Sequence, residues 1–430
     1  MSSRALVLGG GGREHALAHA LARSASVSEV LVAPGNGGCQ GDVDGTPIRR
    51  CAIDRLKPTE VVALATREEV DLVVVGPETP LCDGVVDALD EAGIVAFGPS
   101  AAAARLEGSK AFMKQFCSRH DIPTAPYIIT QDIAEAETYI DQRSRQVVVK
   151  ADGLAGGKGA VVTSNAEEAK AAARAMLVEG KFGDAGRTIV IEDRLEGYEL
   201  SVHLLCDGER YAVLPVSRDH KRVGDDDTGP NTGGMGAFAP LDVDPALMAR
   251  IEERTLRPTI EGMAAEGAPY RGVLYAGVMV SPDGTPYLLE HNVRFGDPET
   301  QVLMPLLSGD VADLLRRAAT GTLEDGPLPL ADRTHSVVVV LAAGGYPANP
   351  RTGDPISGLD DAAQLAGVRV YHAGTKEKDG KLLTNGGRVL GVSACGSSAA
   401  QARQRAYQAI EKIRFEDMHY RRDIATSASN

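Results

Sequence analysis

Three polar side chains recur at every second position near the end of one apolar segment. Glu290, Asn292 and Arg294 follow two leucines, and on a β-strand this spacing puts them on one face, with His291 on the other. Carboxylate and carboxamide oxygens suit Mg²⁺, which takes its remaining ligands from water and phosphate. Arg294 could hold a phosphoryl group or a carboxylate by bidentate contacts. We therefore predict a magnesium site at Glu290 and Asn292, with His291 as a structural residue.

The residues that follow this segment favour a functional site. A solvated strand face would tolerate the same polarity, and that is the alternative interpretation. However, Gly296, Asp297, Pro298 and Glu299 come directly afterwards. A polar cluster behind an apolar strand is more typical of a binding site than of a solvated edge.

The run at 152–159, DGLAGGKG, is a second candidate for phosphate chemistry. It is not a P-loop, because Asp152 stands where the first glycine should be and Gly159 stands where Ser or Thr should follow Lys158. Strand-like runs at 147–150 and 160–162 flank it, which predicts a hairpin tip, a glycine flap able to close over a triphosphate. Lys150 follows three valines, so we expect its stem to be buried; an exposed lysine at a strand end is the alternative.

Four glycines at 9–12 precede Arg13. The dinucleotide-binding spacing G-x-G-x-x-G fails, because the third glycine would fall on Glu14 or His15, and this disfavours a dehydrogenase. A strand–glycine–helix turn still presents free N–H groups at a helix N-terminus, which is an anion site, and Arg13 adds a cation there. A tight turn without a ligand is the alternative.

Two further segments carry weaker signals. The strand-like run at 188–192 leads into acidic residues, which suggests a nucleoside pocket where a carboxylate takes the ribose hydroxyls, although many strands end in Glu. The stretch 219–236 is polar and rich in glycine. Loops of this length are usually lids or binding loops, and a charged surface loop is the alternative.

The elements that must position these residues begin with an α/β pattern. Apolar runs at 5–8, 30–33, 72–75 and 94–97 alternate with helical patterns at 14–23, 59–68 and 84–92. Continuous apolar strands separated by helices imply a parallel sheet covered on both faces. Turns follow the carboxyl ends of these strands, where ligands bind in open parallel sheets.

The rest of the chain reads as α+β. A helix at 110–119 precedes strand-like runs that include 199–206, 211–216, 273–280 and 287–291, with hairpin turns at Asp207-Gly208 and Asp283-Gly284. A linker-like stretch at 321–333 leads to strands at 336–342, 369–371 and 389–394 and a helix at 399–413. We predict an N-terminal parallel-sheet domain at 1–105, a two-lobed domain at 109–320 with a small lid subdomain at about 124–195, and a C-terminal α+β domain at 334–430.

Composition narrows the class of protein. The 430 residues are 43% hydrophobic and 24% charged, with a net charge of −14, which disfavours disorder and a general nucleic-acid or anionic-membrane binder. The six cysteines are scattered without a Cys-x-x-Cys pair, and the N-terminus lacks a signal-peptide pattern. We expect a cytoplasmic protein with reduced thiols, no membrane or nucleic-acid partner, and a monomeric state.

Nearly the whole chain resembles the phosphoribosylamine–glycine ligase (glycinamide ribonucleotide synthetase) family of the ATP-grasp superfamily. The shared motifs are GGREHAL at 11–17, PGN at 34–36, VGPE at 75–78, EGSK at 107–110, KADGLA at 150–155, DHKR at 219–222, TGPNTGGMGA at 228–237, RFGDPET at 294–300, AAGGYP at 342–347 and TNGGRVL at 384–390. The run from 219 to 236 is specific to this family rather than to ATP-grasp enzymes in general.

The resemblance implies an activity and its sites. ATP, glycine and 5-phosphoribosylamine would give ADP, phosphate and glycinamide ribonucleotide, through a glycyl phosphate and with Mg²⁺ or Mn²⁺. The domains would be a pre-ATP-grasp domain, the two-lobed ATP-grasp and a C-terminal domain. The implied residues are Arg294 and Lys150 for catalysis; Lys110, Lys150, Gly153, Gly156, Gly157, Lys158, Gly159, Glu192, Asp193, Leu195 and Glu199 for ATP; and Glu290 and Asn292 for the metal.

The other substrates are expected on the first domain and nearby loops. We expect Gly11, Gly12 and Arg13 near the phosphate of phosphoribosylamine and Glu78 near its ribose hydroxyls. The remaining candidates for substrate binding are Asn36, Asp219, Lys221, Asp297 and Glu299. One departure from the superfamily pattern is that Tyr275-Ala276-Gly277-Val278 stands where many ATP-grasp enzymes place an Asp, so the ligands of a second metal stay open.

The chemistry needs positioning and charge neutralisation rather than a protein nucleophile. The γ-phosphate of ATP activates the carboxylate of glycine, and the flap and the 219–236 loop should exclude water. Two alternatives are another ATP-grasp carboxylate–amine ligase, against which the 219–236 loop argues, and a nucleotide-binding regulatory module without turnover, against which Glu290, Asn292 and Arg294 argue.

Overall fold

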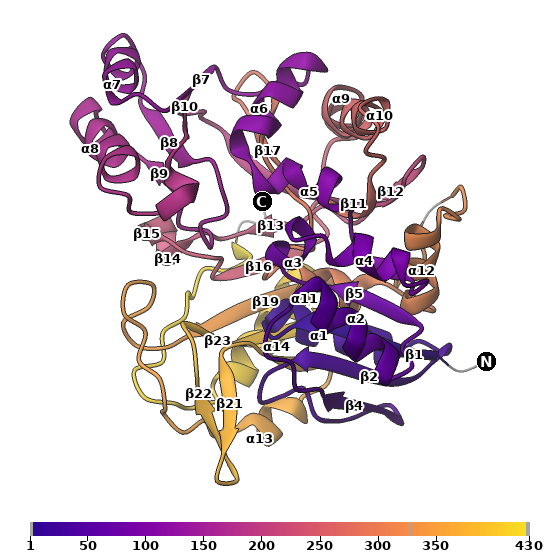
Figure 1. Ribbon diagram of the computed structural model, residues 1–430. Helices are drawn as coiled ribbons and strands as arrows, with labels where there is room; N and C mark the ends of the chain where they lie inside the picture. The colour runs from indigo at the N-terminus through magenta and orange to yellow at the C-terminus, as the bar shows by residue number, and fades with distance from the viewer. Residues whose placement is uncertain (1–2, 327, 333, 427–430) are drawn as a thin grey trace.

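The computed structural model describes residues 3–326, 328–332 and 334–426. Four larger sheets organise the chain, and Figure 1 shows them grouped around the middle of the molecule, with the N-terminal part in indigo and the C-terminal part in orange and yellow. None of the described helices is long and apolar enough to cross a membrane.

The N-terminal sheet is the predicted parallel sheet with one antiparallel edge strand. Its order is β3-β4-β2-β1-β5-β6, and only β3 runs antiparallel to its neighbour. The strands are β1 (Ser3–Gly9), β2 (Val27–Pro34), β3 (Gly41–Val43), β4 (Thr46–Arg50), β5 (Leu72–Val75) and β6 (Ala96–Phe97). The helices are α1 (Gly12–Ala22), α2 (Pro58–Arg67), α3 (Glu78–Cys82), α4 (Val85–Glu91) and α5 (Ala101–Gly108). The β3–β4 hairpin was not predicted from the sequence, although its Asp44-Gly45 turn is a typical hairpin signal.

A separate small sheet forms the lid. Its order is β7-β10-β8-β9, with β7 (Tyr127–Thr130), β8 (Val147–Ala151), β9 (Ala160–Val162) and β10 (Ile189–Asp193). Helices α7 (Ile133–Asp141) and α8 (Ala166–Leu177) cover one face and share a core with Val149 and Ile191. Because side chains alternate along a strand, Lys150 and Glu192 lie on the opposite face.

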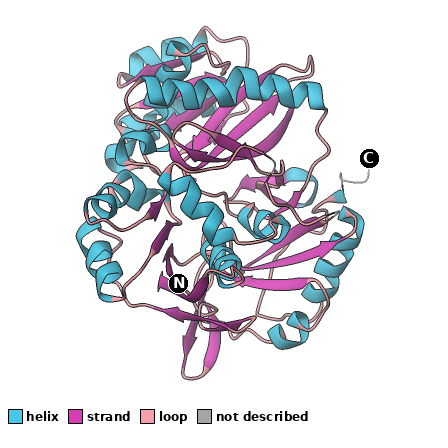
Figure 2. Ribbon diagram, turned by 90° about the vertical axis from the view of Figure 1, so that its right-hand side faces the viewer, coloured by secondary structure: helices cyan, strands magenta, loops and turns pink. Residues whose placement is uncertain are grey.

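The central sheet is antiparallel in the order β12-β11-β17-β18. Its strands are β11 (Tyr198–Asp207), β12 (Tyr211–Val213), β17 (Arg271–Val280) and β18 (Pro286–Asn292), and α6 (Lys110–Arg119) packs beside it. Helix α9 (Pro245–Ile251), a π-helical turn (Glu252–Leu256) and α10 (Arg257–Ala265) form one long rod across the sheet (Figure 2). Leu200, Val202 and Leu204 of β11 face this rod, so Glu199, Ser201 and His203 face the other way.

The C-terminal sheet takes strands from two parts of the sequence. Its order is β13-β16-β19-β23-β20, and β13 (Arg218–Asp219) and β16 (Gly236–Ala239) come from the predicted 109–320 domain. The others are β19 (His335–Ala342), β20 (Val368–His372) and β23 (Arg388–Gly396), with α13 (Leu359–Ala363), α14 (Ala399–Ile410) and the hairpins β14 (Arg222–Gly224)–β15 (Thr228–Asn231) and β21 (Thr375–Lys378)–β22 (Lys381–Thr384). The predicted C-terminal domain therefore completes its sheet with two strands from the preceding domain.

One hydrophobic core joins these parts. It contains Ala5 of β1, Leu205 of β11, Ala237 of β16 and Val338 of β19, together with α11 (Thr300–Leu303) and α12 (Val311–Thr320). Such a continuous core holds the sheets at fixed positions, so loops from all of them can build one site. The boundaries at 1–105, 109–320 and 334–430 stay predictions.

Candidate active site

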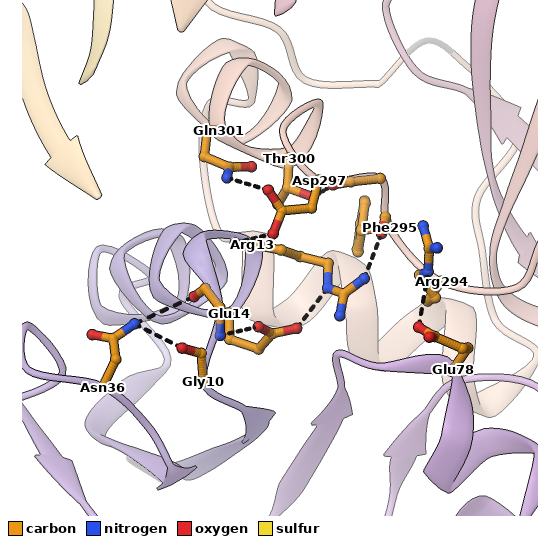
Figure 3. Close-up of polar contacts among 12 residues, drawn as sticks. Gly10, Arg13, Glu14, Asn36, Glu78, Arg294, Phe295, Asp297, Thr300 and Gln301 are labelled. Carbon is orange, nitrogen blue, oxygen red and sulfur yellow. Dashed lines mark hydrogen bonds and ion pairs between the residues drawn. The ribbon is translucent and has the colours of Figure 1, made fainter. Parts of the chain in front are cut away.

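The first glycine turn is held closely against the next strand loop. The Gly11 N–H donates to Glu14 Oε2 at 2.6 Å, and Asn36 Nδ2 donates to the Gly10 carbonyl at 3.0 Å (Figure 3). Asn36 Nδ2 also donates to the His372 carbonyl at 2.8 Å. A Cβ on Gly10 would lie 2.7 Å from the Gly35 carbonyl oxygen, which explains why glycine is needed there. Asn36 is buried and thus holds the turn to the C-terminal part.

A hollow of about 350 Å³ lies between the N-terminal and C-terminal parts. Its lining comprises Gly10, Gly11, Gly35, Asn36, Asp297, Ala373, Gly374, Thr375, Asn385 and Arg388. Helix α1 begins directly after Gly11, so its N-terminal end is directed at this space. Arg388 is the one lysine or arginine in the described lining. No role was predicted for Arg388, because no sequence pattern connects residue 388 with the glycine turn at 9–12.

Arg13 does not occupy the place expected for it. Its Nε pairs with Glu14 Oε1 at 2.6 Å and its Nη1 donates to the Phe295 carbonyl at 3.2 Å, as Figure 3 shows. The side chain is only 8% exposed overall and is absent from the lining of the hollow. Burial and two partners turn the Arg13 guanidinium inward, so the structure does not place the cation expected from Arg13 in this hollow. Gly12 also lies outside the lining, where a Cβ would meet Gln301 Nε2 at 2.6 Å.

Glu78 also lies outside the hollow, and it contacts Arg294 instead. Arg294 Nε lies 3.4 Å from Glu78 Oε2, and its Nη2 lies 3.1 Å from Glu107 Oε1. Glu107 additionally accepts the Val293 N–H at 2.7 Å. Strand β18 ends at Asn292, so these two carboxylates, rather than the strand, orient Arg294. Glu107 belongs to one of the shared motifs, but no role was predicted for it, because no pattern in the neighbouring sequence indicates that it is buried.

Glu290 is surrounded by lysines. Lys110 Nζ lies 3.0 Å from Glu290 Oε2. The Lys110 charge holds the pKa of Glu290 well below its usual range, against the opposing effect of burial, and Lys221 and Lys150 add to the lowering. Glu290 is thus an ionised carboxylate at a strongly cationic position, which is suited to polyphosphate and a divalent cation.

Asn292 fits the role of a second metal ligand. Its amide nitrogen is turned toward Glu107 Oε1 at 3.1 Å and the His291 carbonyl at 3.3 Å, so its amide oxygen points away from these acceptors. His291 behaves as predicted for a structural residue: its Nδ1 lies 3.1 Å from the Tyr275 carbonyl and its Nε2 lies 3.3 Å from the Thr259 hydroxyl. The pair Glu290 and Asn292 is therefore an oxygen donor set of the kind that Mg²⁺ prefers.

The carboxylate of Glu192 is closed to a ribose. It lies between Lys150 Nζ at 2.5 Å and Lys114 Nζ, and the residue is only 2% exposed. Burial alone would raise the pKa of Glu192, but the Lys150 and Lys114 charges outweigh it and lower that pKa. Lys114, on α6, was missed because a lysine inside a helix looks like a surface residue in sequence. The predicted buried stem of Lys150 is confirmed, and its Nζ also donates to the Leu289 carbonyl at 3.2 Å.

The glycine flap is the hairpin tip that the sequence predicted. Strands β8 and β9 pair antiparallel on either side of it, and Lys158 at the tip is exposed. Asp152 at its base accepts from the Ser109 hydroxyl at 2.8 Å and from the Ala111 N–H at 2.7 Å. The base of the flap is therefore anchored to α6 while its tip is open to solvent. Of the other nucleotide candidates, Asp193 contacts Arg143 at 3.2 Å, and Leu195 is half-buried in the irregular segment that follows β10.

The 219–236 stretch is a strap fixed at its tip rather than a free lid. Arg421 Nη1 pairs with Asp227 Oδ1 at 2.7 Å, the Asp226 N–H donates to Asp423 Oδ2 at 2.9 Å, and His419 Nε2 lies 2.7 Å from the Val223 carbonyl. Residues 225–231 are exposed, as the surface-loop alternative expects, and the C-terminal segment ties the β14–β15 hairpin down. A role of this stretch in binding stays a prediction.

The first residues of this strap include a lysine, Lys221, that lies near Glu290. Lys221 forms an ion pair with Glu199. Burial alone would lower the pKa of Lys221, but Glu199, Tyr275, Glu290 and Asp219 together raise it. Lys221 is therefore a charged lysine close to the Glu290 carboxylate.

Family models and relatives agree along the chain. Residues 3–107, 108–300 and 336–427 match models described as the N domain, the ATP-grasp (A) domain and the C domain of phosphoribosylglycinamide synthetase. Proteins named phosphoribosylamine–glycine ligase from Vibrio parahaemolyticus and Escherichia coli K12 are each 47% identical, over 99% of this chain and 98% of their own.

Solved structures give the same result. The crystal structure of phosphoribosylamine–glycine ligase from Thermotoga maritima is 35% identical, with a TM-score of 0.83 over 98% of this chain and 99% of that one. Biotin carboxylase from Campylobacter jejuni shares the fold, with a TM-score of 0.73 and 15% identity over 100% of this chain and 96% of that one.

Proposed function

Because the chain belongs to the phosphoribosylglycinamide synthetase family, it is an ATP-dependent ligase that joins glycine to 5-phosphoribosylamine in purine biosynthesis, and we propose which residues perform each part of this reaction. The observation that carries the proposal is the convergence of Lys110, Lys150 and Lys221 on Glu290, next to a hollow shared by the N-terminal and C-terminal parts.

ATP binds between the lid and the central sheet. Lys110 and Lys150 hold the phosphates, the flap from Gly153 to Gly159 closes over them, and Glu199 is the carboxylate near enough to solvent to reach the ribose. Enzymes of the ATP-grasp type use a divalent metal ion together with ATP, and here Glu290 and Asn292 would hold Mg²⁺ or Mn²⁺, which would neutralise phosphate charge. Lys110 forms an ion pair with Glu290. Its ammonium would turn toward phosphate when the nucleotide is bound.

Phosphoryl transfer to the glycine carboxylate gives an acyl phosphate and ADP. The amine of phosphoribosylamine then attacks the carbonyl carbon, the C–O bond to phosphate breaks, and phosphate leaves while the nitrogen loses a proton. Lys150, Lys221 and Arg294 spread the charge that develops on the phosphoryl oxygens, in a buried setting where such contacts are strong. Glu78 and Glu107 keep the Arg294 guanidinium in place. The flap excludes water, which would otherwise hydrolyse the acyl phosphate.

Phosphoribosylamine occupies the hollow. The N-terminal end of α1 and the Arg388 guanidinium provide the positive potential for its phosphate. Asp297 and Asn36 border the same space. Arg13 stabilises the glycine turn instead of binding phosphate.

The experiment that tests this function is ADP release measured with Mg²⁺ and ATP, omitting glycine or phosphoribosylamine in turn. We expect full turnover only with both substrates and a stoichiometric amide product. ADP release that continues at the same rate without glycine would contradict the proposed function. The cytoplasmic location and the monomeric state stay predictions.

A further inference from the structure

Two enclosed carboxylates, of the buried Glu299 and the partly buried Asp219, lie beside the proposed phosphoryl site without an ion-pair partner. Glu299, at the start of α11, is 4% exposed, and its Oε1 accepts the Ser201 hydroxyl at 3.1 Å. Asp219, on β13, has a fully enclosed Oδ1 with no hydrogen-bond partner among the described residues. Within the described parts of the chain, no lysine or arginine nitrogen lies within 4 Å of either carboxylate.

These two groups influence each other. Burial raises the pKa of Asp219 well above its usual value, and the Glu299 charge raises it further. Burial also raises the pKa of Glu299. Carboxylates that are enclosed without a cation cost folding free energy, which is the expected condition of a site that is completed by a cationic ligand.

The space around the carboxylates admits only a small group. A Cβ on Gly234 would lie 2.8 Å from Asp219 Oδ1, and a Cβ on Gly296 would collide with Glu299 Oε2. Both backbone segments therefore close directly on the carboxylate oxygens. A compact ammonium fits such a position, whereas an amino acid with a longer side chain would have to displace the backbone.

Cations lie on the side facing the phosphoryl site. The Lys221 charge acts on both Asp219 and Glu299, and the Arg294 charge acts on Glu299. Lys221 also acts on Glu290. The charges of Lys221 and Arg294 thus act both on these carboxylates and on the metal-binding Glu290, which suits a bound zwitterion, and the Arg388 charge also acts on Asp219.

We propose that Asp219 and Glu299 together bind the ammonium group of glycine and direct its carboxylate toward Lys221 and Arg294. This inference rests on the proposed function. Ser201 acts as a positioning residue, because it fixes one oxygen of Glu299 and leaves the other for the ligand.

The test uses Glu299→Gln and Asp219→Asn, which keep the shape and remove the charge. We expect the KM for glycine to rise ten- to hundredfold in each, with the KM for phosphoribosylamine and the Kd of a non-hydrolysable ATP analogue within threefold of wild type. Glycolate, which has a hydroxyl in place of the ammonium, should inhibit the variants as well as it inhibits wild type. The variants thus lose discrimination between glycine and glycolate.

A general-base role for either carboxylate would give another result. In that case kcat would fall and its pH profile would shift while the glycine KM stayed unchanged, and this outcome would overturn the inference. An equal rise in the KM values of both substrates would overturn it as well. Wild-type ADP release that does not need glycine refutes the proposed function itself, so the two failures are distinguishable.

Two more variants keep the test decisive. Ser201→Ala removes only the hydroxyl that holds Glu299, and we expect a severalfold rise in the glycine KM even if the carboxylate variants fold poorly. Glu266→Gln, in a surface pair with Arg119 at 2.9 Å, is the matched control and should leave both KM values unchanged. A Ser201→Ala enzyme with wild-type glycine KM would count against the inference.

Discussion

At the scale of single residues, the arginine that borders the hollow comes from a distant part of the sequence. Arg13 is adjacent to the glycines in sequence, yet its guanidinium contacts Glu14 and the Phe295 carbonyl. Arg388, for which no role was predicted, comes from the far end of the chain and lines the hollow. Proximity in sequence to the glycine turn therefore did not indicate which arginine borders the hollow.

Arg388→Met should raise the KM for phosphoribosylamine about 10- to 100-fold, because a charge-assisted hydrogen bond contributes about 1.5–3 kcal/mol. ATP affinity should stay near the wild-type value. Arg13→Ala should mainly lower thermal stability, since it removes a buried partner of Glu14. Steady-state kinetics with each substrate varied separately, alongside thermal unfolding, compare the two variants. A larger rise in KM for Arg13→Ala than for Arg388→Met would restore the original assignment.

Arg294→Ala should reduce kcat by about 10²–10³-fold, since loss of a transition-state donor costs about 3–4 kcal/mol. Binding of a non-hydrolysable ATP analogue, measured by calorimetry, should change far less. Arg294→Lys should rescue poorly, because a single ammonium cannot bridge Glu78 and Glu107 as the guanidinium does. If kcat stays within about threefold of wild type, well under the ~1.4 kcal/mol of one decade, Arg294 has no catalytic role.

At the scale of elements, the β14–β15 strap depends on the C-terminal segment. The Arg421 side chain is 1% exposed and contacts Asp227 at 2.7 Å and Asp423 at 2.5 Å. Because the strap begins at Asp219 and Lys221, this anchor also sets the position of two proposed substrate residues. Burial opposes the charge of Asp423, yet the Arg421 contacts lower its pKa to about 2, so this clamp stays charged at neutral pH.

Arg421→Met should lower the free energy of unfolding by about 2 kcal/mol, less than for a fully buried pair because Asp227 is largely exposed. Amide exchange in 222–231 should accelerate more than in β19, which packs in the core. Arg351→Met is the control, since Arg351 pairs with Asp354 and Asp417 near the surface and should cost below about 1 kcal/mol. Equal protection of 222–231 in both variants would show that Arg421 does not anchor the strap.

At the scale of the whole molecule, three histidines lie where the N-terminal and C-terminal parts meet. His15 is buried and His19 is partly buried on α1, and His15 faces the partly buried His372 of β20, with 3.1 Å between the Nε2 atoms of His15 and His19. Burial lowers the pKa of His19 and of His372 to about 4 each. Uncharged imidazoles therefore contribute to the interface between these two parts.

Stability should consequently fall in mild acid. The unfolded chain takes up these protons near pH 6.5 and the folded chain only near pH 4, so each histidine's contribution is complete above about pH 6.5 and is lost as the pH falls toward 4. Across that range, each such histidine lowers the free energy of unfolding by about 1.4 kcal/mol for every pH unit of acidification. Urea unfolding between pH 7 and 5 measures how steeply the free energy of unfolding depends on pH. His372→Gln should reduce this slope by the equivalent of one proton taken up on unfolding. A flat profile down to pH 5 would contradict the prediction.

The sequence alone determined the local architecture and the type of chemistry. Alternating apolar runs predicted β1, β2 and β5, Asp-Gly turns predicted the hairpins of the central sheet, and the spacing of Glu290 and Asn292 predicted an oxygen donor set, because strand periodicity and turn geometry depend on neighbours in sequence. Only the tertiary structure decided which charges meet. Lys114 pairs with Glu192, Glu107 orients Arg294, and Arg388 lines the hollow. Each of these arrangements brings together residues that are far apart in the sequence and belong to different elements, and a side chain's burial and partners follow from packing that no local pattern records.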